Sequence, residues 1–573
     1  MIATTKYLAG RAGFLTKRAL RLIALEVSGL QRAVYVLALF ALLSSVLALL
    51  RDRLLAHVFG ASTTLDLYYA AFRIPDFLFV GIGALVTVYI LIPELARRTP
   101  QEGQRYIDTI LTGFSLLAAL LCACAALFAP ALLTLLFPAF VAQGLLPTLT
   151  MMTRIMLLQP VLLGFSNIFA AITQSRQRYL LYSISPLLYN LGIIVGTVFL
   201  YPLLGISGLA WGVVLGAFLH AGIQIPSLIG DGFLHRVPRL YEPRALIETV
   251  IVSVPRALAL SMSEIAELGL IALAALLAPG SVAIFNFAYN LQAVPLSVIG
   301  ASYSVAAFPG LAASLAAGKR DEFVAHVATA ARFVCFWSLP ATALVIVLRA
   351  HLVRVILGSG AFNWNDTRLT AAAFALFALS LAAQGLMLLL LRAYYAAGRT
   401  FVPFLVSTAI ALLTILLGAA SVGAIHASMF SDAAKAFLRV AGVTGTGVLA
   451  LASVYSFVSI VGTLVLLVHF EHRFRGFLRQ VIFSWGQSLV ASLACGAGAY
   501  LALNLVGPIT LSSTVLSVFL RGLAGGLSGI IVCAAVYALL GSREFKETLG
   551  ALHARMRRVK LTPSMVAAAE EHL

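Results

Sequence analysis

Apolar stretches long enough to cross a lipid bilayer recur from one end of this chain to the other. A membrane helix needs about 20 apolar residues to cross about 30 Å of hydrocarbon. Hydropathy predicts fourteen such spans in the 573 residues, at approximately 33–50, 75–95, 108–128, 148–173, 180–201, 206–229, 250–278, 283–308, 328–348, 369–391, 401–424, 445–469, 480–505 and 517–541. The stretches lack the alternation of apolar and polar residues that a membrane β-barrel requires. The chain is therefore predicted to be an all-α polytopic membrane protein.

The composition excludes a soluble globular fold. Hydrophobic residues make up 61% of the chain and charged residues 10%, whereas soluble domains average about 45–50% and about 25%. The formal net charge of +18 would suggest nucleic acid as the partner of a soluble protein. Here 27 of the 39 Lys and Arg residues fall in alternate connections between the predicted spans. Cytoplasmic loops are enriched in these residues, so both termini are predicted to be cytoplasmic. The charge then serves topology and attraction to membrane lipids, with no nucleic acid as partner.

The other twelve Lys and Arg residues lie outside the predicted cytoplasmic connections. Seven are predicted to lie in outside connections, namely Arg51, Arg53, Arg349, Arg354, Arg368, Lys435 and Arg439. Five lie at predicted membrane depth, namely Arg73, Arg154, Arg256, Arg332 and Arg521. A charge at membrane depth is costly unless it faces a polar cavity. The charges at membrane depth therefore point to a transport path, whereas Arg332 and Arg521 are interpreted as snorkelling or packed residues.

An internal repeat predicts the domain organisation. Residues 68–96 resemble residues 285–312 with a gap of one residue, which indicates two parallel six-span units with two further spans. The predicted division is a basic amphipathic segment at 1–31, an N-lobe at 32–230, a cytoplasmic linker at 231–249, a C-lobe at 250–470, spans 13 and 14 at 471–541, and a cytoplasmic tail at 542–573.

Catalysis and metal binding are not expected. The chain has no Walker-type loop, no His-Glu-x-x-His motif and no soluble segment large enough for a nucleotide domain. The five cysteines fall inside apolar stretches without metal-ligand spacing. The sequence therefore predicts a transporter rather than an enzyme, with no cofactor and no metal.

Span 7 carries the richest group of charges at membrane depth. Arg256 and Glu267 are eleven residues apart and project from nearly the same helix face, and Glu264 is a neighbour of Glu267 at i,i+3. We predict a site that faces a cavity and binds either an anionic group through Arg256 or a coupling cation through the two glutamates. The alternative is a structural ion pair that joins two helix bundles.

Two spans contain residues that favour bends. Pro75 follows Ile74 in span 2, and span 8 contains Pro295 and Gly300. Proline removes a backbone hydrogen bond from a helix. We predict a break at Ile74-Pro75 and a bend in span 8, at places where two bundles could move; ordinary kinks are the alternative.

The segment from Leu50 to Ala61, read as LRDRLLAHVFGA, and the segment 65–75, read as LDLYYAAFRIP, resemble the N-terminal signature of the MurJ/MviN family. This family comprises the lipid II flippases of the MOP exporter superfamily. The resemblance implies a MATE-like fold with two six-helix lobes around a central cavity and a lipid-facing groove at spans 13 and 14. It also implies alternating access that moves undecaprenyl-pyrophosphate-linked peptidoglycan precursor (lipid II) to the outer leaflet of a bacterial plasma membrane. Coupling to the membrane potential or a Na⁺ or H⁺ gradient, and cell-wall synthesis proteins as partners, follow from the same likeness.

The chain departs from the family pattern at three places. Where the family has cavity cations thought to hold the pyrophosphate, this chain has Ser44-Ser45, Phe79-Val80 and Tyr289-Asn290. We predict that Arg256 compensates, and the full set of predicted site residues has three parts. Substrate binding is assigned to Arg73, Arg256, Asn286, Asn290 and Gln292; the outer gate to Arg51, Asp52 and Asp66; and ion coupling to Glu264 and Glu267.

Three functions remain open at this point. The first is lipid II flipping, which the signature around residues 50–75 favours. The second is transport by a MOP-type carrier of another polyprenyl-linked glycan, or cation-coupled export, which the lost arginines favour. The third is a transport-dead membrane scaffold for cell-wall synthesis. Stabilisation by substrate separates a carrier from a scaffold, because only a carrier gains stability from its ligand.

Overall fold

The computed structural model describes residues 30–83, 91, 94–95, 97–176, 178–231, 233, 238–424, 432–507, 513–551 and 553. Within these ranges all the regular structure is helical, so the predicted all-α class is confirmed. All but the last two residues of the amphipathic segment predicted at 1–31, and most of the tail predicted at 542–573, lie outside the described residues.

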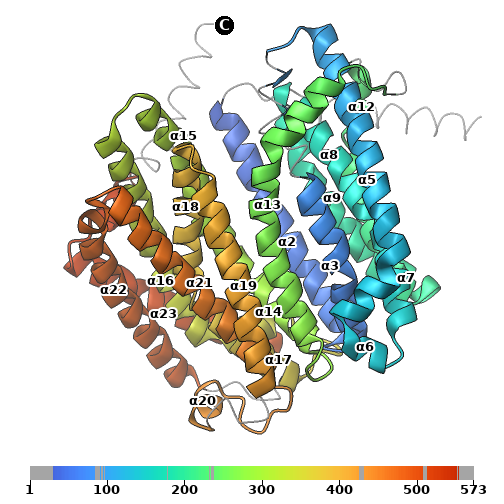
Figure 1. Cartoon of the computed structure of the whole chain (residues 1–573). Coiled ribbons are helices and arrows are strands. Elements are labelled where there is room, and N and C mark those ends of the chain that lie inside the picture. The colour runs from blue at the N-terminus through green and yellow to red at the C-terminus, as the bar shows by residue number, and fades with distance from the viewer. Residues whose placement is uncertain are drawn as a thin grey trace, which may run out of the picture.

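Residues 30–230 form one group of helices, coloured blue to blue-green in Figure 1. We keep the name N-lobe for this group. Its helices are α2 (Leu30–Phe59), α3 (Thr63–Gly83), α5 (Pro100–Leu136), α6 (Pro138–Ala142), α7 (Leu146–Met156), α8 (Leu158–Ser175), α9 (Tyr179–Val195), the π-helix η2 (Gly196–Leu200), α10 (Tyr201–Leu204), α11 (Ile206–Gly222) and α12 (Ile225–Gly230).

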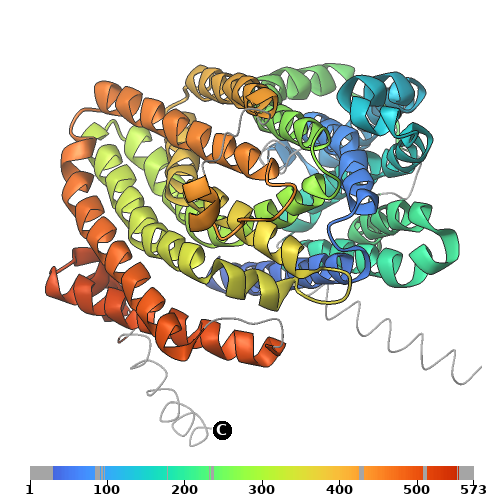
Figure 2. The ribbon, with the colours of Figure 1, turned by 90° about the horizontal axis from the view of Figure 1, so that it is seen from below.

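The later helices form a second group, and α13 (Pro243–Ala274) lies between the two, packed against α3 on one side and α19 on the other. We keep the name C-lobe for α13 to α21. After α13 come α14 (Ser281–Leu296), the π-helix η3 (Ser297–Ala301), α15 (Ser302–Ala316), α16 (Arg320–Ile356), α17 (Trp364–Ala378), α18 (Leu381–Ala396), α19 (Phe401–Ala424), α20 (Asp432–Phe437) and α21 (Val448–Arg473). The last two helices, α22 (Phe477–Val506) and α23 (Val515–Leu539), pack on α16 at the edge of the molecule (Figure 2).

The described helices make this a multi-pass membrane protein. Eleven of them are long and apolar enough to cross a membrane, or twelve when α17 and α18, which meet at an angle of 44°, count as one span. Helices α2 and α3 occupy the region of the first two predicted spans but fall outside that count, and α3 carries Asp66, Arg73 and Asp76. The total of fourteen spans therefore stays a prediction.

The two predicted irregularities have different outcomes. Helix α3 begins at Thr63 and continues through Pro75, so the predicted break at Ile74-Pro75 and the predicted start of span 2 at residue 75 are wrong. Hydropathy placed the start too late because the first turns of α3 carry charged residues. In span 8 the helix changes to π-helical hydrogen bonding at Ser297–Ala301, directly after Pro295, as expected where a proline removes a donor.

Two helices of the N-lobe approach each other closely through glycines. Gly196 begins η2, and Gly212 lies in α11. A Cβ added at Gly212 would lie 2.5 Å from the Cα of Gly196, which leaves no room for a side chain. Small residues at such contacts let membrane helices pack through their backbones.

Gly212→Leu is expected to force α11 away from η2 and to lower the free energy of unfolding by at least about 1–3 kcal/mol, the usual cost of overpacking. The melting temperature of the purified protein in detergent measures the effect. Gly222→Leu is the matched control, because a Cβ at Gly222, the last residue of the same helix, would meet no atom within 4 Å. Equal melting temperatures for the two variants would contradict this account of the packing.

Candidate functional site

Asp66 links the two lobes at the end of the bundle predicted to be extracellular. It lies in the first turn of α3 and its side chain is buried. Its Oδ2 accepts a hydrogen bond from the backbone N–H of Gly280 at 2.6 Å, and its Oδ1 accepts one from Ala283 at 2.9 Å. The first N–H groups of a helix have no partner within that helix, and α14 has no side-chain cap of its own at Gly280. Asp66 therefore caps α14 from the other lobe, with the charge that a helix N-terminus favours.

The end of α2 makes a second contact between the lobes. Arg53 Nη1 donates to the carbonyl oxygens of Val355 and Ile356, at the end of α16. The N–H of Ala361, in the connection to α17, donates to the carbonyl of His57 at 2.8 Å. The acceptors of these bonds are backbone carbonyls. The bonds therefore form only where the backbones of the two lobes lie close together.

Glycines with positive φ make that close range possible. Gly280 has φ +87°, and a Cβ there would lie 2.4 Å from the carbonyl oxygen of Ala61 in the other lobe. Gly360 has φ +57°, and a Cβ there would lie 2.3 Å from the carbonyl oxygen of His57. Both the backbone conformation and the space require glycine.

A polar network crosses the same interface at the two residues of α2 that precede Arg53. Arg51 donates from Nε and Nη2 to Asp52 Oδ1, at 3.0 and 2.8 Å, and from Nη1 to Asn190 Oδ1 in α9 at 3.0 Å. Asp52 Oδ2 accepts from Asn290 Nδ2 in α14 at 3.0 Å. The Asp52 side chain is 4% exposed, so its charge is balanced by these partners rather than by water.

The predicted gate residues Arg51, Asp52 and Asp66 thus all lie where the lobes meet. Their contacts with α14 or with the network that reaches it are the geometry a gate requires. Their role in gating stays a prediction.

A buried ion pair joins α3 to α13. Arg73 is 8% exposed and pairs through Nη1 with Glu267, while its Nε donates to the carbonyl of Tyr69 at 3.2 Å. Asp76 lies 3.8 Å from Arg73 Nη2 and accepts from Gln159 in α8 at 3.1 Å. The predicted substrate-binding Arg73 and the predicted coupling residue Glu267 are therefore partners. Glu264 also interacts electrostatically with Arg73.

The other predicted substrate-binding residues are not brought together. Asn286 donates from Nδ2 to the carbonyl of Val282 in its own helix at 2.8 Å. Gln292 is 1% exposed, and its amide nitrogen has no hydrogen-bond partner among the described residues. Asn290 is engaged by Asp52. Arg256 lies in α13, but its side chain is outside the part of the chain whose side chains the structure describes.

Sequence reasoning missed three residues of this interface. Asp76 has a signal in the sequence, because a carboxylate three residues after Arg73 is on the same helix face. Asn190 and Gln159 have none, since an uncharged polar residue in a span is common and its partners are distant in sequence. These three residues bind Arg51, Arg73 or each other within the N-lobe, and they extend the polar contacts that Asp52 and Arg73 make with the other lobe.

Known proteins resemble this chain over most of its length. The family model described as "Lipid II flippase MurJ" matches residues 55–520. The lipid II flippase MurJ of Burkholderia cenocepacia is 26% identical over 404 residues, which cover 67% of this chain and 77% of that protein. The probable lipid II flippase MurJ of Buchnera aphidicola subsp. Schizaphis graminum is 25% identical over 393 residues, which cover 66% and 75%.

Solved structures share the fold. A lipid II flippase MurJ in an inward closed conformation aligns with a TM-score of 0.70 and 21% identity, covering 88% of this chain and 99% of that chain. An inward-facing multidrug resistance MATE family transporter of the MOP superfamily aligns with a TM-score of 0.60 and 15% identity, covering 76% and 96%. The predicted MATE-like fold is therefore confirmed.

Proposed function

Because this chain belongs to the MurJ family of lipid II flippases, we propose that it moves lipid II from the cytoplasmic to the outer leaflet of the bacterial plasma membrane by alternating access. The family match over residues 55–520 is the observation that carries this proposal. The activity is transport, and both termini are cytoplasmic in the proposed topology.

The interlobe contacts support a mechanism in which the two lobes rock against each other. Opening the outer end requires α14 to give up its hydrogen bonds to Asp66 and Asp52. A hydrogen bond to a charged group contributes about 1.5–3 kcal/mol. The outer end therefore opens only when hydrogen bonds to water, or substrate binding, offset the free energy of the lost bonds. Closing restores the same bonds and returns the site to the cytoplasmic side.

The ion pair between Arg73 and Glu267 supports a role in substrate recognition and coupling. A pyrophosphate group is an anion that an arginine binds through paired hydrogen bonds, so it competes with Glu267 for Arg73. Once released, Glu267 and the neighbouring Glu264 are free to take a proton or a sodium ion. Substrate binding and cation binding are then linked through one arginine, and Arg256 is the further cation assigned to the headgroup.

Translocation of labelled lipid II in proteoliposomes tests the function. With an imposed membrane potential, the purified protein is expected to move lipid II and to leave an unrelated polyprenyl-linked glycan in place, with protein-free liposomes as the control. Transport of the other glycan alone would instead assign a different polyprenyl-linked substrate. No transport of either, together with no thermal stabilisation by lipid II, would favour the scaffold and overturn the proposal.

A further inference from the structure

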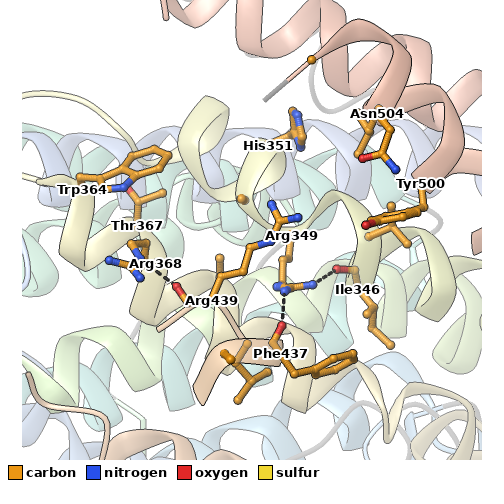
Figure 3. Close-up of a pocket in the computed structure, with 17 residues that line it drawn as sticks. Ile346, Arg349, His351, Trp364, Thr367, Arg368, Phe437, Arg439, Tyr500 and Asn504 are labelled. Carbon is orange, nitrogen blue, oxygen red and sulfur yellow. Dashed lines mark hydrogen bonds between the residues drawn. The ribbon is translucent and has the colours of Figure 1, made fainter. Parts of the chain in front are cut away.

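A cavity of about 760 Å³ lies between the C-lobe and α22, at the end predicted to be extracellular (Figure 3). It is bounded by the end of α16, the start of α17, the segment after α20 and the end of α22. It shares no residue with the interlobe contacts described above.

The cavity is lined by cations. Three cations, Arg349, Arg368 and Arg439, line it together with the neutral His351, and none of the described lining residues is an Asp or a Glu. The three arginines belong to the small set predicted to lie in outside connections, where the positive-inside rule disfavours them. Topology therefore does not account for their being placed together, whereas a bound anion would.

The guanidinium groups of two arginines are held by carbonyl oxygens instead of carboxylates. Arg349 donates to Ile346 at 2.6 Å and to Phe437 at 3.2 Å. Arg368 donates to the carbonyl of Arg439 at 2.8 Å. These bonds fix the orientation of each group but leave its positive charge unneutralised. A guanidinium has five N–H donors, so donors remain for a ligand.

Arg439 is held in a backbone conformation that suits glycine. Its φ is +59°, and among the described residues it is the one non-glycine with positive φ. It follows α20 in a helix-ending motif, in which the N–H of Val440 donates to the carbonyl of Lys435 at 2.9 Å. Glycine is the usual residue at this position. An arginine here carries a conformational cost, and its exposed side chain extends from the loop into the cavity region (Figure 3).

His351 gives independent evidence for a ligand. Its side chain is in α16 and only 9% exposed, and neither ring nitrogen has a hydrogen-bond partner among the described residues. A buried polar atom without a partner is destabilising. An oxygen bound in the cavity that His351 lines would satisfy one of them.

We propose that this cavity binds the phosphate group of an anionic phospholipid of the outer leaflet. Arginine side chains bind phosphate oxygens through charge-assisted hydrogen bonds, and the apolar part of the lining, which includes Val347 and Leu503, accommodates the adjoining glycerol and chain. A free phosphate would use the same cations, so the test separates the two sources. The site does not depend on the proposed function.

Binding to the purified full-length protein in detergent tests the proposal, with three probes: dioctanoyl phosphatidylglycerol, dioctanoyl phosphatidylcholine and inorganic phosphate. Phosphatidylglycerol is expected to bind at least tenfold more tightly than the other two. Arg439→Gly should weaken that binding about tenfold, the effect of losing one charge-assisted bond. The melting temperature of the free variant should not fall, because glycine suits the backbone at this position. Arg368→Gln should also weaken binding.

Lys435→Gln is the matched control. Lys435 lies in α20, four residues before Arg439, and does not line the cavity. It should bind phosphatidylglycerol within twofold of the unaltered protein. Equal binding of phosphatidylglycerol and phosphatidylcholine, or equal loss in Lys435→Gln and Arg439→Gly, would overturn the proposal. Inorganic phosphate binding as tightly as the lipid would overturn the lipid as the source of the anion.

Discussion

Asp66→Asn is expected to separate the lobes at their predicted outer end and to reduce lipid II flipping at least tenfold. The substitution keeps the size of the side chain but replaces one acceptor oxygen with an N–H₂ donor. That donor then faces one of the two N–H groups, of Gly280 and Ala283, that the carboxylate now accepts from. Loss of one bond to a charged group, at about 1.5–3 kcal/mol, shifts the closed state against the open state by about tenfold or more.

Spin labels report this separation directly. Gln143, in the connection between α6 and α7, and Asn365, in α17, are exposed residues of the two lobes. The distance between labels at these positions should lengthen or broaden in Asp66→Asn. The control is Asp231→Asn, which breaks an ion pair with Arg178 inside the N-lobe and should leave the distance unchanged. An unaltered distance and full flipping in Asp66→Asn would refute the assignment of Asp66 to the gate.

Arg73→Gln is expected to be more destabilising than Glu267→Gln, and both are expected to stop transport. Removing one partner of a buried ion pair strands the other charge, which costs about 3–5 kcal/mol. The two variants are not equivalent, because Asp76 remains near Arg73 when Glu267 is neutralised. When Arg73 is neutralised, Glu267 and Asp76 instead keep their negative charges without that cation. Melting temperatures of the two purified variants measure the difference.

The double variant Arg73→Gln/Glu267→Gln separates a structural role from a functional one. It strands no charge within the pair, so it should recover much of the stability lost in Arg73→Gln. It should still fail to flip lipid II, because the arginine that we assign to the headgroup is absent. Normal flipping by the double variant would show that the ion pair only joins the lobes, which is the alternative that the sequence left open.

The membrane class and the all-α fold follow from the sequence because each apolar span must satisfy its backbone internally, whatever its neighbours. Arg51, Asp52 and Asp66 could be singled out as interface residues because they are charged residues in a short, recognisable segment. The partners that these residues bind could not be identified from the sequence. Asp66 binds N–H groups more than 200 positions away, and backbone donors carry no side-chain signature.

The start of α3 shows where hydropathy fails to locate a helix. A hydropathy average treats Asp66, Arg73 and Asp76 as evidence against a span, whereas the folded chain gives each of them a polar partner inside the bundle. Asn290 illustrates a related difficulty. It occupies a position at which the family resemblance implies a cation, yet its amide binds Asp52, so its contribution is to the contact between lobes.

The capping of α14 by Asp66 makes the backbone N–H groups at the start of that helix sensitive to contact between the two lobes. Its N–H groups at Gly280 and Ala283 have an acceptor only while the lobes are together. Separation of the lobes would expose them to solvent, so the rate of their hydrogen–deuterium exchange is expected to rise with the fraction of molecules in which the outer end is open. A ligand or membrane potential that moves the lobes apart is therefore expected to raise the exchange rate of these two amides in the unlabelled protein.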